Sequence, residues 1–85
     1  MKYTHHSDNA HGWLEVTVAD CQAVKLNPSD FSAYSYRDGD TLYLEEDCDM
    51  SKFMAACICY DEPPIIEHSH FNGESPTRKM EHLQV

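Results

Sequence analysis

The clearest alternation of hydrophobic and polar positions lies between residues 31 and 45. It predicts two β-strands, Phe31–Tyr36 and Thr41–Glu45, because successive side chains of a strand point to opposite faces. Between them, Asp38-Gly39 is a dipeptide typical of a type I′ turn, whose two central residues adopt positive φ. The pattern therefore predicts a β-hairpin with a two-residue loop.

The register of this hairpin gives it two unlike faces. With that loop, Tyr34 lies directly opposite Tyr43, and both share a face with Tyr36. The other face carries Leu42 and Leu44. We expect the leucine face to pack under helices and the tyrosine face to stay accessible; the reverse arrangement is the alternative.

A broad apolar stripe predicts a helix over Met50–Tyr60, with Phe53 as a buried anchor. The acidic segment Glu45–Asp49 leads into this helix. Either Asp47 or Asp49 can cap the free amides of the first turn, where negative charge is also favoured. The acidic segment therefore has a structural role in addition to any functional one.

The remaining periodic segments complete the predicted fold. Trp13–Val18 alternates and predicts a half-buried strand, Asp20 is a candidate cap for a short helix over Cys21–Leu26, and Ile65–Phe71 predicts a last strand. The element order is β, α, β, β, α, β. It predicts a small α+β domain with a mostly antiparallel sheet and two helices, and it is also the order of a ferredoxin-like split βαβ sandwich.

The two ends of the chain lack this periodicity. Met1–Gly12 is polar and rich in histidine, with a turn predicted at Ser7–Asn9. We expect residues 1–73 to form one domain and residues 74–85 to be a flexible or lightly docked tail. A candidate helical turn in that tail consists of Thr77, Met80 and Leu83.

Charge narrows the choice of partners. The 85 residues include 15 acidic and 6 basic ones, which gives a formal net charge of −9 at pH 7. This charge disfavours direct binding to nucleic acid or anionic membranes and favours a protein partner with a basic surface. No apolar run approaches the roughly 20 residues of a membrane span, and the first residues lack the pattern of a signal peptide. We therefore expect a cytoplasmic protein.

Four cysteines and six histidines raise the question of a metal site. The two cysteines of the predicted helix are two positions apart and point in different directions, so we expect reduced cysteines with a structural role. His68 and His70 alternate on one face of a strand, where two imidazoles can approach one zinc or copper ion, with His5 or His11 as further ligands. The alternative is that these histidines are ordinary surface or half-buried strand residues.

Signatures of catalysis are absent. Asp38–Asp49 begins like a calcium loop, but Tyr43 stands at the position that requires glycine and an aspartate ends the loop in place of glutamate. The three glycines are too scattered for a phosphate-binding loop, and no Gly-x-Ser-x-Gly motif is present. We expect a protein that is not an enzyme and that carries no cofactor.

Four segments of the sequence resemble those of known proteins. They are Tyr3-Thr4-His5-His6-Ser7-Asp8, His11-Gly12-Trp13-Leu14-Glu15-Val16, Tyr34-Ser35-Tyr36 and Tyr43-Leu44-Glu45-Glu46-Asp47-Cys48-Asp49. In these segments the chain resembles a set of short uncharacterised proteins carried by bacteriophages, plasmids and proteobacterial genomes. The resemblance implies no biochemical activity. It does imply an accessory protein of a mobile element that works in the bacterial cytoplasm.

Two classes of function follow from these observations. The leading hypothesis is a small acidic accessory protein that binds and modulates a host or phage protein, for example as an inhibitor whose carboxylates mimic the phosphates of a nucleic acid. The predicted binding surface joins the tyrosine face to the acidic segments: Tyr34, Tyr36, Tyr43, Asp38, Asp40, Glu45, Glu46, Asp47 and Asp49. The alternative is a zinc- or copper-binding protein that uses His68 and His70.

Overall fold

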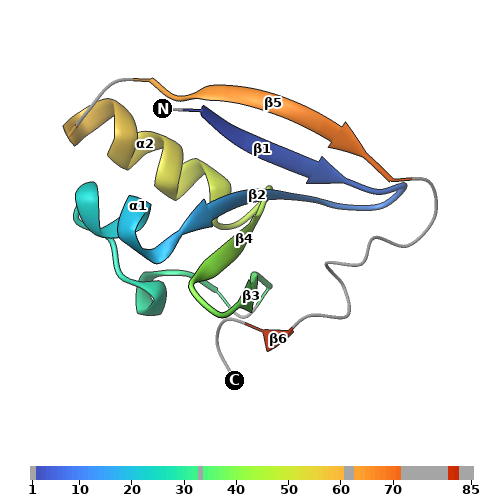
Figure 1. Cartoon of the computed structure of the whole chain (residues 1–85), viewed down its shortest axis with the longest axis horizontal. Coiled ribbons are helices and arrows are strands. Elements are labelled where there is room, and N and C mark those ends of the chain that lie inside the picture. The colour runs from blue at the N-terminus through green and yellow to red at the C-terminus, as the bar shows by residue number, and fades with distance from the viewer. Residues whose placement is uncertain (1, 33, 61–62, 72–80, 83–85) are drawn as a thin grey trace.

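The computed structural model of the chain describes residues 2–32, 34–60, 63–71 and 81–82 (Figure 1). The helices are α1 (Val18–Ala23) and α2 (Met50–Tyr60), with a short 3₁₀ turn η1 (Pro28–Asp30) after α1. The strands are β1 (Lys2–Ser7), β2 (Gly12–Thr17), β3 (Tyr36–Asp38), β4 (Thr41–Glu45), β5 (Ile65–His70) and β6 (Glu81–His82). The predicted α+β fold with two helices is therefore confirmed.

The strands of the described residues form one six-stranded sheet in the order β5-β1-β2-β4-β3-β6. Only β1 and β5 are parallel, and every other neighbouring pair is antiparallel, as expected of a mostly antiparallel sheet. The units β2–α1–β3 and β4–α2–β5 each join two parallel strands with other strands lying between them. This is a split βαβ arrangement, similar to the ferredoxin-like one but with β1 inserted between β5 and β2.

Both helices pack on one face of the sheet (Figure 1). Leu42 and Leu44 point to this face and are fully buried, together with Phe53 of α2. The ring of Phe53 meets the ring of Tyr3 edge to face, with 5.2 Å between centroids. The expectation that the leucine face of the hairpin lies under the helices, with Phe53 as an anchor, is thus confirmed.

The predicted register of the hairpin is wrong by two residues. Tyr36, not Tyr34, lies opposite Tyr43, and the two-residue loop is Gly39-Asp40. The register is fixed from outside the hairpin, because β4 pairs with β2 and the amide of Val18 then donates to the carbonyl of Asp40 at 2.9 Å.

The loop also differs in its turn type. Of its two residues only Gly39 has a positive φ, 61°, which is the type II′ pattern rather than type I′. Type II′ confines the left-handed conformation to glycine, which has no Cβ to clash. A shift of two residues preserves the side-chain faces, so the tyrosines still point away from the leucines.

β1 was not predicted, since its sequence offers only Tyr3 as an apolar residue. Its inward positions are taken by Tyr3 and by His5, a polar residue that is nevertheless buried. The turn predicted after it is present: the Asp8 carboxylate accepts the amides of Ala10 and His11. β1 is a central strand, paired with β5 on one side and β2 on the other.

The first helix begins three residues earlier than predicted. Thr17 is the N-cap of α1 and accepts the amide of Asp20, whose carboxylate accepts the amide of Thr17 in return. Asp20 is therefore the reciprocal partner in a capping box rather than the cap itself.

The C-terminal region joins the sheet at β6. Tyr36 and Arg37 of β3 pair with His82 and Glu81, so this part of the predicted tail is docked. The candidate turn formed by Thr77, Met80 and Leu83 lies outside the described residues.

Replacement of Phe53 tests the core. Phe53→Ala should lower the free energy of unfolding by about 3–5 kcal/mol, because it removes a fully buried ring and leaves a cavity. Ile58→Ala is the matched control on the same helix, since Ile58 is 62% exposed and should change stability by less than about 0.5 kcal/mol. Chemical denaturation measures both values, and equal effects would contradict the packing described here.

Cys21 provides a pH-dependent test of the same core. Burial, with smaller contributions from Asp20 and Cys57, raises the pKa of the Cys21 thiol to about 12 from its ordinary value of 9.0. As the pH rises, the thiol therefore loses its proton in the unfolded chain before it does so in the folded protein. The free energy of unfolding declines as the pH rises above 9.

In denaturation at pH 8 to 10.5, the stability of the parent should fall relative to Cys21→Ala by up to about 1.4 kcal/mol per pH unit above pH 9. Cys59→Ala, which removes an exposed thiol, should follow the parent. Parallel curves for the parent and Cys21→Ala would show that the Cys21 thiol titrates alike in both states.

Candidate functional site

The face of the sheet opposite the helices carries most of the aromatic side chains that were predicted to bind a partner. Register places Glu15, Tyr43 and Tyr36 side by side across β2, β4 and β3. In the next row Trp13 of β2 lies opposite Glu45 of β4. Neither α1 nor α2 packs against this face, which we call the open face.

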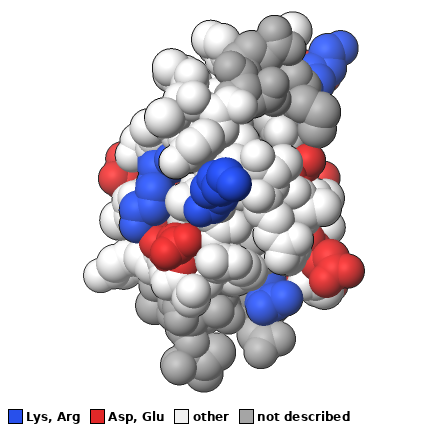
Figure 2. Space-filling view, turned by 90° about the vertical axis from the view of Figure 1, so that its left-hand side faces the viewer, with Lys and Arg blue, Asp and Glu red and all other residues white. Residues whose placement is uncertain are grey.

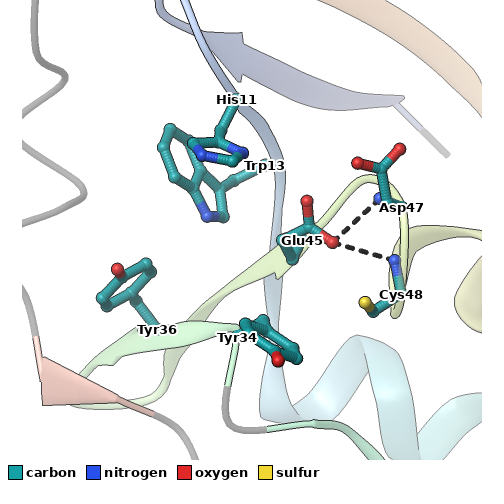
Figure 3. Close-up of a pocket in the computed structure, with 7 residues that line it drawn as sticks. All are labelled: His11, Trp13, Tyr34, Tyr36, Glu45, Asp47 and Cys48. Atoms are coloured by element: carbon teal, nitrogen blue, oxygen red, sulfur yellow. Dashed lines mark hydrogen bonds between the residues drawn. The ribbon is translucent and has the colours of Figure 1, made fainter.

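A pocket of about 290 Å³ opens at one end of the open face (Figure 3). It is lined by aromatic rings from β2, β3 and the segment before β3, and by the acidic turn between β4 and α2. The lining residues are His11, Trp13, Tyr34, Tyr36, Glu45, Asp47 and Cys48.

The aromatic wall is positioned by the sheet. Trp13 is only 2% exposed, and its ring lies 6.0 Å from that of Tyr36 and 6.1 Å from that of His11, measured between centroids. His11 is held by the turn in which its amide donates to Asp8 at 2.8 Å. Tyr34 is 67% exposed and forms the accessible rim of this wall.

The acidic wall is held by a local hydrogen-bond network. Glu45 Oε2 accepts the backbone amides of Asp47 and Cys48, both at 2.9 Å (Figure 3). Glu45 is only 7% exposed, so these bonds compensate part of the cost of burying its carboxylate. In Figure 3 its second oxygen points away from these amides, toward the side of the pocket where His11 and Trp13 lie.

A buried carboxylate joins the two walls. Asp49, 1% exposed, accepts the amide and hydroxyl of Ser32 and the hydroxyl of Ser35. Ser35 Oγ in turn accepts the amide of Glu45 at 2.9 Å, and Ser32 Oγ accepts the amide of Tyr34. The segment that carries Tyr34 is thereby fixed to the segment that carries Glu45 and Asp47.

The same contacts decide the capping of α2. The carbonyl of Asp49 accepts the amide of Phe53 at 3.2 Å, so the backbone of Asp49 occupies the N-cap position. Its side chain is directed to Ser32 and Ser35 rather than to the first turn of the helix.

The structure brings together some of the predicted site residues. Tyr34, Tyr36, Glu45 and Asp47 line the pocket, and Tyr43 lies beside Tyr36 on the open face. The others lie elsewhere: Asp38 and Asp40 are at the far end of the hairpin, Glu46 bonds to His5, and Asp49 is inaccessible to a partner.

Three lining residues were not predicted to bind a partner: His11, which was named only as a further metal ligand, Trp13 and Cys48. The sequence did contain a signal for Trp13, since it alternates with Leu14 and Val16 and so must lie on the face of β2 away from the core.

Two pKa values on this side of the molecule are raised. Desolvation raises the pKa of Tyr43, with further contributions from the charges of Glu15 and Asp38. Desolvation also raises the pKa of the Cys48 thiol, together with a hydrogen bond to Glu45 and the surrounding acidic charges. Both groups are thus neutral at pH 7, and the Cys48 thiol lacks the electropositive setting of a reactive cysteine.

The histidines proposed as metal ligands lie on the helix-bearing face, at the edge formed by β5. His68 is beside His5, with ring centroids 5.4 Å apart, while His70 bonds to Ser7 Oγ at 3.0 Å. His5 Nε2 is 3.1 Å from Glu46, and His11 is in the pocket instead. Within the described residues, no three histidine, cysteine or acidic side chains are placed to hold a metal ion.

Charged side chains are not distributed evenly. Figure 2 shows basic and acidic residues interspersed on the face that it turns to the viewer. Among the described residues, no lysine or arginine lines the pocket, whereas Glu45 and Asp47 do. The pocket side is therefore locally acidic.

The helices in the described part of the chain are too short or too polar to cross a membrane.

Comparison with known proteins adds no relative: no family model, no curated protein and no solved structure matches the chain.

Removing the buried carboxylate tests whether it supports the site. Asp49→Ala should lower the free energy of unfolding by about 3 kcal/mol, because it leaves buried donors of Ser32 and Ser35 without their acceptor. Asp47→Ala, at an exposed position two residues away, should change it by less than about 0.5 kcal/mol. Denaturation curves that coincide for the two variants would contradict a structural role for Asp49.

Proposed function

We propose that the chain is a small acidic accessory protein that binds a protein partner through the open face, with the pocket at the centre of contact. The partner presents a basic surface and is a host or phage protein of the bacterial cytoplasm, as the sequence resemblance implies. Binding modulates that partner; the chain itself performs no chemistry.

The observation that carries this proposal is the position of Tyr34. It is a large aromatic residue, 67% exposed, at the rim of a preformed pocket. Tyrosine buries a large area on binding at a low cost in side-chain entropy, and for this reason it recurs at the centres of protein interfaces. Because the Asp49 network holds the Tyr34 backbone, little further ordering is needed.

The acidic side chains support a basic partner. Asp47 lies at the pocket and Asp38 and Asp40 at the exposed end of the hairpin, so negative charge flanks the aromatic residues on two sides. Such charges accelerate association and orient the partner more than they increase the final affinity.

Mimicry of a nucleic acid is one form that this binding can take, because spaced carboxylates can occupy a basic groove. The face shown in Figure 2 mixes both signs of charge, whereas Glu45 and Asp47 line the pocket without a described lysine or arginine, so the pocket is the better candidate for such mimicry.

Affinity capture from bacterial lysate, with variants compared side by side, tests the proposal. Proteins retained by the parent should be lost with Tyr34→Ala, and the purified partner should dissociate at least about tenfold faster from this variant. Tyr60→Ala is the matched control: Tyr60 is 57% exposed at the other end of α2 and should leave the dissociation rate unchanged. A partner that both variants retain equally would place the interface elsewhere.

The acidic residues have a separate kinetic signature. The double variant Asp38→Asn/Asp40→Asn should slow association and flatten its dependence on salt, with little change in the dissociation rate. Stopped-flow measurement at several ionic strengths resolves the two rates. An association rate that is independent of salt in the parent would contradict electrostatic steering.

A further inference from the structure

We propose that the pocket is a receptor for a single arginine side chain of the partner. The inference rests on the proposed function, which concerns the open face as a whole, and adds the chemical group that the pocket recognises. It follows from the shape of the pocket, its aromatic rings and its two carboxylates.

The size of the pocket suits one long side chain. Its volume of about 290 Å³ lies just below the usual range for small-molecule sites, roughly 300–1,000 Å³, and is too small for a helix or a strand. The ring of Trp13 lies at its base and Tyr34 stands at its rim, so an entering side chain passes along aromatic surface (Figure 3).

The charge of the pocket favours a positively charged side chain. Glu45 and Asp47 are among the residues that line the pocket, and no basic side chain of the described residues lines it. In the described part of the chain, Glu45 Oε2 accepts two backbone amides and the Cys48 thiol also bonds to this carboxylate, whereas no hydrogen bond reaches the Asp47 carboxylate. A cation that enters the pocket therefore meets two acceptors beside aromatic faces, and both attract it.

Guanidinium fits this arrangement better than ammonium. It is planar and stacks on aromatic rings, and it is more weakly hydrated, so it loses less on leaving water. Its N–H donors lie in one plane and point outward, so they can reach two carboxylates that come from adjacent parts of one turn while the flat face stays against a tyrosine.

The chain provides its own reporter for this inference, because Trp13 is its single tryptophan. In a titration followed by ¹H–¹⁵N correlation spectra, N-acetyl-arginine methylamide should shift the Trp13 indole resonance and the Tyr34 amide saturably. The citrulline analogue has the same shape without the charge and should bind at least about tenfold more weakly. The lysine analogue should bind about threefold more weakly than arginine.

Two variants with equal change in net charge localise the effect. Asp47→Asn should weaken arginine binding by about three- to fivefold, whereas Glu67→Gln, on the outer strand β5, should weaken it by less than about twofold. Both residues are exposed, and the spectra themselves report whether each variant is folded.

Each remaining outcome decides the question. Equal binding of citrulline would overturn recognition of a cation, and stronger binding of lysine would overturn the choice of guanidinium. Equal effects of the two variants, or shifts remote from Trp13, would overturn the location. If arginine fails to bind while Tyr34→Ala still releases a basic partner, the pocket assignment fails and the proposed function stands; if Tyr34→Ala releases nothing, the proposed function itself fails.

Discussion

The buried carboxylate of Asp49 is the interaction on which the arrangement of the site depends. A carboxylate can be buried only if its oxygens are hydrogen-bonded, and here the hydroxyls of Ser32 and Ser35 and one backbone amide supply those bonds. The network connects the segment before β3 to the N-cap residue of α2. It therefore links the helix layer to the sheet at the point where the pocket forms.

This link explains why aromatic and acidic residues from different parts of the chain converge. Ser35 Oγ bonds to both Asp49 and the amide of Glu45, so β4 and the segment before β3 are held in one arrangement. Tyr34 and Asp47 each lie next to a member of this network and take their positions from it. Trp13 lies next to these residues because β2 pairs with β4.

Local periodicity was enough to predict much of the fold. The bounds of α2 agree with the predicted helix, and the leucine and tyrosine faces of the hairpin were assigned correctly because the period of a strand is two. The errors arise where a distant segment decides. The position of the loop depends on the hydrogen bond from the amide of Val18 to the carbonyl of Asp40. β1 is a strand because it pairs with β2 and β5 and because its buried His5 bonds to Glu46.

The candidate site shows the same division. The sequence predicted a face of tyrosines beside acids, although only Tyr34 of the three is exposed, but it did not show the different roles of the acids. Glu45, Asp47 and Asp49 alternate along an acidic segment, yet one faces the pocket from a buried position, one is exposed and one is internal. Nothing local distinguishes them, because their roles are set by which donors from other segments each carboxylate meets.

The burial of Glu45 has a consequence for binding that an exposed acid would not have. Two backbone amides of its own turn hold one carboxylate oxygen, so the other is oriented before any partner arrives. An exposed carboxylate must give up side-chain freedom and hydration when it forms an ion pair, and the net gain is small. A carboxylate that has already been ordered and partly desolvated during folding avoids most of that cost. The stability of the fold thus maintains the pocket in a state prepared for a positively charged group.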